Sequence, residues 1–184
     1  MEPTTQEEYA RVEAQRNAVK TYKKVQRKYL LTSRFNKETA QINESYRKSH
    51  GRGCIYGAPC PISKKIPTDS PLFILEMNND TNKIMGIGLI KNHPRTGIQL
   101  YDNRNYNRYV YAGKHRIARS EMTEDEENIM KALDNLCFTG LNHMKRGNGL
   151  KSFPIEMLVR INSVLDLVEV IAEMFKKRIL TAKE

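Results

Sequence analysis

The stretch that decides the fold is Leu72-Phe73-Ile74-Leu75-Glu76-Met77, followed after five residues by Lys83-Ile84-Met85-Gly86-Ile87-Gly88-Leu89-Ile90. The first run is apolar and short, which is typical of a buried strand, and the second predicts a returning strand. Asn78 to Asn82 between them has the composition of a turn. Side chains alternate along a strand, so Gly86 and Gly88 share one face, where they indicate sharp curvature or close approach of another group. We therefore expect an antiparallel pair in a small curved sheet.

On the N-terminal side of this pair, residues 1–50 predict a basic helical arm. An apolar stripe recurs there at helical spacings and is narrow; its members are Tyr9, Val12, Val19, Tyr22, Val25 and Tyr29. Between Arg11 and Lys48 there are eleven Lys or Arg and three Glu. Because so narrow a stripe rarely stabilises a lone helix, we expect the arm to dock on the body or on a partner. Residues 1–45 should then add affinity for a polyanion and contribute little to the core.

Two stretches, Ser49–Gly53 and Gly57–Pro61, have the composition of loops and mark the boundary between this arm and a core domain over 51–184, whose central part from about 54 to 118 is predicted to be β. Within the core, a second hairpin is predicted over Asn107–Ile117, with Ala112-Gly113 at its turn. Thr123 begins a helix that should end at Phe138, and Ser152 and Pro154 open one last long helix. The expected fold class is α+β: a small curved, mostly antiparallel sheet or barrel, an N-terminal helical arm and two C-terminal helices.

The charge of the chain indicates a polyanionic partner. It has 31 Lys and Arg against 21 Asp and Glu, a net charge of +10, and nucleic acid is the commonest polyanion inside cells. The first six residues are polar and acidic, which argues against a secretory signal. No apolar run is long enough to span a bilayer, so we expect no membrane partner. The alternative is a merely soluble basic protein.

The strongest functional cluster lies between Lys91 and Arg119. It holds seven Lys or Arg against one Asp, interleaved with four tyrosines. Cations neutralise phosphates and aromatic rings stack on unpaired bases. The predicted contact residues are Tyr106, Arg108, Tyr109, Tyr111, Lys114 and Arg116, with Tyr109 and Tyr111 on one face of a strand. The alternative is a solvated face whose tyrosines pack at a sheet edge.

A second basic loop, Asn142–Lys151, adds Lys145 and Arg146 to the predicted nucleic-acid contacts. Its glycines would let backbone N–H groups approach an anion, and it should precede a helix N-terminus. It lacks the Gly-Lys-Ser/Thr ending of a phosphate-binding loop, so nucleotide hydrolysis is not indicated. A generic surface loop is the alternative.

No catalytic centre, metal site or cofactor is predicted. Cys54 and Cys60 are six apart, as are Cys137 and His143, whereas zinc ligands usually occur as closer pairs. Buried free thiols are the simpler interpretation. The histidines stand in no arrangement with Ser or Asp that would indicate nucleophilic catalysis. A nuclease or other enzyme acting on nucleic acid is therefore the last alternative.

The strand pair Phe73–Met77 and Ile84–Ile90 resembles that of PUA-like domains, a superfamily that includes the EVE and YTH modules. The resemblance implies a curved barrel that binds RNA or modified bases, although this chain has no Trp for a methyl-base cage. The stretch from Cys54-Ile55-Tyr56-Gly57 to His143-Met144-Lys145-Arg146-Gly147 is also similar to uncharacterised proteins of large nucleocytoplasmic DNA viruses. That resemblance implies the cytoplasm or nucleus of an infected cell, or a virion.

These observations leave two main hypotheses. The first is a non-catalytic nucleic-acid-binding module, for RNA or DNA. The second is a basic structural or interaction protein of a viral particle or virus factory, whose arm contacts viral protein partners.

Overall fold

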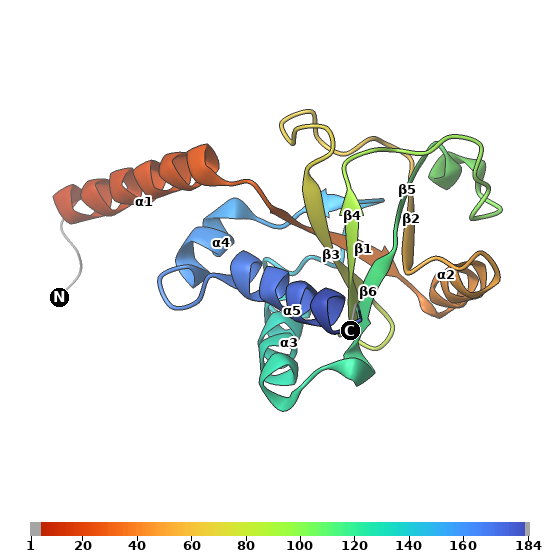
Figure 1. The fold of residues 1–184 in the computed structure, drawn as a ribbon. Helices are drawn as coiled ribbons and strands as arrows, with labels where there is room; N and C mark the ends of the chain where they lie inside the picture. The colour runs from red at the N-terminus through yellow and green to blue at the C-terminus, as the bar shows by residue number, and fades with distance from the viewer. Residues whose placement is uncertain (1–4, 183–184) are drawn as a thin grey trace. The chain divides into compact units, whose positions relative to one another are not determined.

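A computed structural model describes residues 5–182, drawn in Figure 1. The chain divides into two compact units. One comprises the N-terminal segment up to Arg27 together with the segment from Phe153 onward, and the other is Lys28–Ser152. Residues 1–4, part of the segment expected to carry no secretory signal, lie outside the described residues.

The Lys28–Ser152 unit is built on a mixed five-stranded sheet with the order β6-β4-β3-β1-β7. Its strands are β1 (Tyr29–Phe35), β3 (Pro71–Asn78), β4 (Lys83–Lys91), β6 (His115–Ala118) and β7 (Lys151–Ser152). The predicted pair is confirmed, since β3 and β4 are antiparallel with Leu72 opposite Ile90. Within the described residues no ladder joins β6 to β7, so the sheet is open; of the two predicted forms, sheet or barrel, the barrel is wrong. The α+β class is confirmed.

A second, two-stranded sheet pairs β2 (Cys54–Ala58) with β5 (Tyr109–Gly113) in antiparallel register. It contacts β4 closely, because a side chain at Gly88 would collide with the Tyr56 hydroxyl and Cys54. The absence of a side chain at position 88 is thus required by the close approach of another strand, one of the two explanations expected for these glycines. In Figure 1 this strand pair lies to one side of the larger sheet, and α2 (Lys37–Ser49) lies farther out on the same side.

The predicted hairpin over Asn107–Ile117 is wrong, because its two strands belong to different sheets. β5 pairs with β2, whereas β6 pairs with β4. The chain crosses between sheets at Gly113, which lies so close to the carbonyl oxygen of Leu89 that a Cβ there would collide with it. A Gly in this place fits both a hairpin turn and a crossing, so local composition could not separate them.

The continuous helical arm predicted for residues 1–50 is also wrong over Tyr29–Phe35. That segment is β1, which lies between β3 and β7 and runs parallel to β3. Leu30, Leu31 and Phe35 are buried, so this part of the N-terminal region belongs to the core. Removing residues 1–45 would remove an interior strand, and the expectation that they contribute little to the core fails for β1. α2 follows, capped by Asn36.

The first helix of the C-terminal third is confirmed. α3 (Glu124–Phe138) begins at a capping box formed by Thr123 and Glu126, and Gly140 follows it with φ +75°. The Arg119 guanidinium binds both Glu127 (2.6 Å) and Asp134 (2.9 Å), which ties α3 to the chain after β6.

The other unit contains α1 (Thr5–Val25), α4 (Ile155–Ile161) and α5 (Leu167–Thr181). The single long helix predicted after Pro154 is therefore wrong. The helical spacing of apolar residues continues from Leu158 to Val168. A new helix nevertheless begins at Leu167, because the Asp166 side chain caps it by accepting a hydrogen bond from the Glu169 backbone N–H. α1 packs on α4 within this unit. Burial raises the pKa of Tyr22, and the negative charge of Asp166 raises it further by a smaller amount.

Candidate nucleic-acid interface

A pocket of about 370 Å³ opens in the Lys28–Ser152 unit. It lies where the ends of β1 and β2 meet the start of α2 and the segment that leads into β5. Its lining combines aromatic, polar and charged side chains, namely Ser33, Arg34, Glu38, Thr39, Ile42, Tyr101, Asp102, Asn103 and Tyr106, with Gly57 and Gly149. The volume is in the range of a small-molecule site.

The aromatic part of the lining is Tyr101 and Tyr106, whose rings meet edge to face with centroids 6.3 Å apart. The Asn107 side chain holds this segment by accepting from the Leu100 and Tyr101 amides (both 2.9 Å) and donating to the Tyr101 carbonyl (2.6 Å). Gly57 packs directly against the same segment, since a Cβ at this position would collide with the Tyr106 carbonyl oxygen. Burial raises the pKa of Tyr101 to about 12, and a hydrogen bond with Asn43 opposes that rise. The hydrogen bonds of Asn107 thus hold the segment that carries both rings.

Ser33 is the buried polar group of the pocket. It is 6% exposed, and its hydroxyl makes no hydrogen bond within residues 5–182. Side chains alternate along β1, so Ser33 shares a face with Leu31 and Phe35, which are core residues. Because Ser33 lines the pocket, its hydroxyl can donate a hydrogen bond to a ligand or accept one from it.

Arg34 adds a positive charge that no carboxylate neutralises. Its Nε donates to the Met144 carbonyl (2.6 Å) and its Nη2 to the Thr32 hydroxyl (3.1 Å), while Nη1 is buried without a partner. No acid of the described residues lies within ion-pair distance of it. Burial lowers the pKa of Arg34, but a guanidinium keeps its proton in proteins.

Cations stand close in the sequence to lining residues in two segments of the chain. Arg104 and Arg108 stand two residues before and after Tyr106, at the short 3₁₀ helix Arg104–Asn107. Arg146 is exposed and Lys145 half-buried in the loop whose Gly149 lines the pocket. That loop is fixed by Asn79, which donates to the Lys145 carbonyl (3.0 Å). It leads through the two-residue β7 to the start of α4 at Ile155, so a helix N-terminus follows the loop as expected.

The predicted contact residues separate into exposed and internal groups. Tyr106 lines the pocket, and Arg108, Lys145 and Arg146 stand close in the sequence to lining residues. Lys114 is exposed but follows the opposite end of β5.

Tyr109 and Tyr111 share a face of β5, as predicted, and that face packs against the core. Tyr111 is 1% exposed, and its hydroxyl accepts from the Ile62 amide (3.1 Å). Its ring is unavailable for stacking on a base.

Arg116 is bound inside the protein by Glu76. Its Nε and Nη2 donate to Glu76 Oε2 at 2.9 and 2.6 Å, and the Tyr56 hydroxyl donates to Oε1 at 2.8 Å. Glu76 is 2% exposed. Burial lowers the pKa of Arg116, but the Glu76 carboxylate outweighs burial and leaves it raised. Arg116 therefore neutralises a buried acid and is no free phosphate contact.

Several pocket residues escaped sequence reasoning. Ser33 and Arg34 lie in a segment interpreted as helix, and Asp102 was counted only as the single acid of a basic cluster. Tyr101 belonged to that cluster, and its position between Leu100 and Asp102 carried no further signal. Glu76 could have been found, because a lone acid in an apolar strand needs a buried cationic partner.

The described residues contain no group of three or more His, Cys, Asp or Glu side chains placed to bind a metal ion. Cys54 and Cys137 are buried, and burial raises the pKa of each thiol to about 12, while Cys60 is exposed. Among the described helices, none has the length and apolar character that crossing a membrane requires.

Comparison of the chain with protein-family models, with curated proteins and with solved structures finds no match. The resemblances to PUA-like domains and to viral proteins accordingly stay predictions.

Proposed function

We propose that this protein binds nucleic acid and that the pocket at Tyr101 and Tyr106 receives an unpaired base. The observation that carries the proposal is the combination of two aromatic rings in the pocket lining with exposed cations in the same chain segments as lining residues. Aromatic side chains stack on unpaired bases of any kind, and cations beside them neutralise the adjoining phosphates. The PUA-like relationship and an infected-cell setting belong to this proposal.

In this proposal the exposed cations bind phosphates and the pocket binds a base. Arg104, Arg108 and Arg146 are exposed and form no ion pair among the described residues, so their counterions are free to be replaced by phosphates. Binding through such contacts falls steeply as salt rises. The pocket would supply a contribution that depends much less on salt, because stacking and burial of a base involve no counterion release.

Replacing Tyr106 by alanine is expected to weaken binding of a short single strand by about 1–3 kcal/mol, because a stacking ring is lost. The half-buried ring contributes little to the core, so the melting temperature should change only slightly. Fluorescence anisotropy of a labelled oligonucleotide across several salt concentrations measures the effect.

Tyr9→Ala is the matched control, since it removes an exposed ring on α1 that does not line this pocket. Equal affinities for Tyr106→Ala and the parent protein, with both folded, would argue against base stacking in the pocket.

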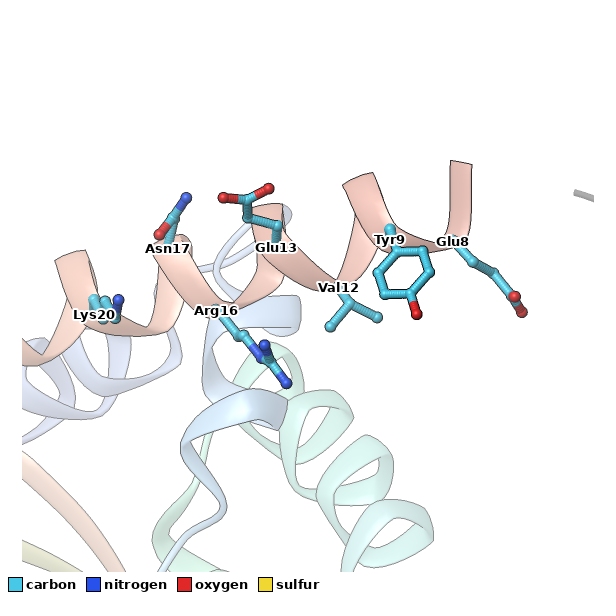
Figure 2. A pocket seen from close by; sticks show the side chains of 7 residues that line it. All are labelled: Glu8, Tyr9, Val12, Glu13, Arg16, Asn17 and Lys20. Carbon is cyan, nitrogen blue, oxygen red and sulfur yellow. The ribbon is translucent and has the colours of Figure 1, made fainter. Parts of the chain in front are cut away.

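A second candidate function is docking on a partner protein through α1. Residues 6–18 are all exposed, and Tyr9 and Val12 are 74% and 47% exposed. Figure 2 shows Tyr9, Val12 and Arg16 projecting to one side of this helix. A viral structural protein could use such a face. Partner binding that persists at high salt and is lost in Val12→Asp would favour this function over the first.

A further inference from the structure

We infer that the pocket discriminates between bases by their exocyclic amino groups, with Asp102 as the acceptor. Adenine, cytosine and guanine carry such a group, whereas uracil and thymine do not. The inference rests on the proposed function, because it describes which base the pocket prefers.

The lining carries two carboxylates, Glu38 and Asp102, and neither forms an ion pair within residues 5–182. An ionised carboxylate only accepts hydrogen bonds. It therefore attracts an N–H₂ group and repels a carbonyl oxygen. Uracil and thymine offer this acceptor only their ring N3–H, which lies between two carbonyl oxygens that the carboxylate repels, so their binding should be weaker.

Asp102 is better placed to read a base than Glu38. It directly follows Tyr101, whose backbone Asn107 holds on both its N–H and its C=O. The carboxylate thus starts from a fixed point beside a ring on which the base would stack. Glu38 stands in the first turn of α2, where the helix dipole alone accounts for an acid.

The remaining polar groups of the lining fit this assignment. The free hydroxyl of Ser33 can donate or accept, so it holds a base edge without distinguishing amino from carbonyl. The Asn103 side-chain oxygen already accepts from the Asn105 amide (3.1 Å). Asp102 is therefore the acceptor of this segment that stays available to a ligand.

The test uses the full chain and oligouridine strands that are identical except for one central base. Strands with central adenine, cytosine or guanine should bind about fivefold or more tightly than the all-uridine strand. Asp102→Asn should remove the preference, because its amide can donate to the carbonyl oxygens of uracil. Asp69→Asn makes the same charge change at an exposed position outside the pocket and should retain it.

The outcomes separate this inference from the proposed function. If no strand binds, the proposed function fails and the inference with it. If all strands bind equally, or the uridine strand binds best, the inference alone is overturned. A preference that survives in folded Asp102→Asn also overturns it. Asp102→Ser removes the carboxylate without introducing an amide, so the preference should be lost in this variant as well.

Discussion

Replacing Arg116 by alanine is expected to lower the free energy of unfolding by about 3–5 kcal/mol, because it leaves the Glu76 carboxylate buried without a counter-charge. Glu76 is 2% exposed and Arg116 is its only ion-pair partner among the described residues. Tyr56 would continue to donate one hydrogen bond, which cannot neutralise the charge. Urea denaturation of the variant and the parent protein measures the difference.

The double variant Glu76→Ala/Arg116→Ala is the control for this interpretation. Residues in one ion pair are coupled, so the double variant should lose less stability than the sum of the two single variants. Nucleic-acid affinity per folded molecule should be unchanged in Arg116→Ala. Unchanged stability with weakened binding would instead restore Arg116 as the phosphate contact that the sequence indicated.

Replacing Tyr111 by alanine is the second change with a large expected effect, a loss of about 3–5 kcal/mol in the free energy of unfolding. The side chain is 1% exposed and packs in the cluster that includes Leu31, Leu72 and Ile90. Removing the ring would leave a cavity in that cluster. Thermal and urea unfolding check the prediction, while anisotropy on the folded fraction should show unchanged affinity.

Tyr111→Phe separates the ring from the hydroxyl. It keeps the packing and removes only the acceptor of the Ile62 amide, so the loss should be smaller, about 1–3 kcal/mol. If Tyr111→Ala folded as stably as the parent protein and bound less tightly, the ring would act in recognition and its assignment to the core would be wrong.

The parts of the fold that the sequence predicts correctly are governed by neighbours along the chain. The β3–β4 pair is joined by a short turn, and α3 starts at a capping box whose two residues are three apart. In both cases the deciding contacts lie within a few positions of one another. Propensity and spacing therefore suffice.

The parts that it misses depend on distant contacts. β1 is a strand because it lies between β3 and β7, which are remote in the sequence, and Tyr29 continued the spacing of a helical stripe. β5 pairs with β2, which is also remote in the sequence, and the Gly113 at its end lies against the Leu89 carbonyl of β4. Neither partner can be identified from local pattern.

The candidate site divides in the same way. Tyr106, Arg108, Lys145 and Arg146 were predicted as contacts, since a dense mixture of rings and charges is visible in the sequence itself. Whether a given Tyr or Arg faces outward was not, because Tyr111 and Arg116 are placed by contacts with Ile62 and Glu76. The pocket also needs Ser33 and Asp102, which only the folded chain brings together.

Ultraviolet crosslinking of a bound single strand, followed by mass spectrometry of the crosslinked peptides, tests the proposed interface most directly. We expect crosslinks at Tyr101 or Tyr106, and none at the buried Tyr111. The crosslinks should decrease as salt is raised, because the exposed cations hold the strand in place. Crosslinks confined to α1, or to residues outside the pocket lining and the segments that carry these cations, would contradict the account.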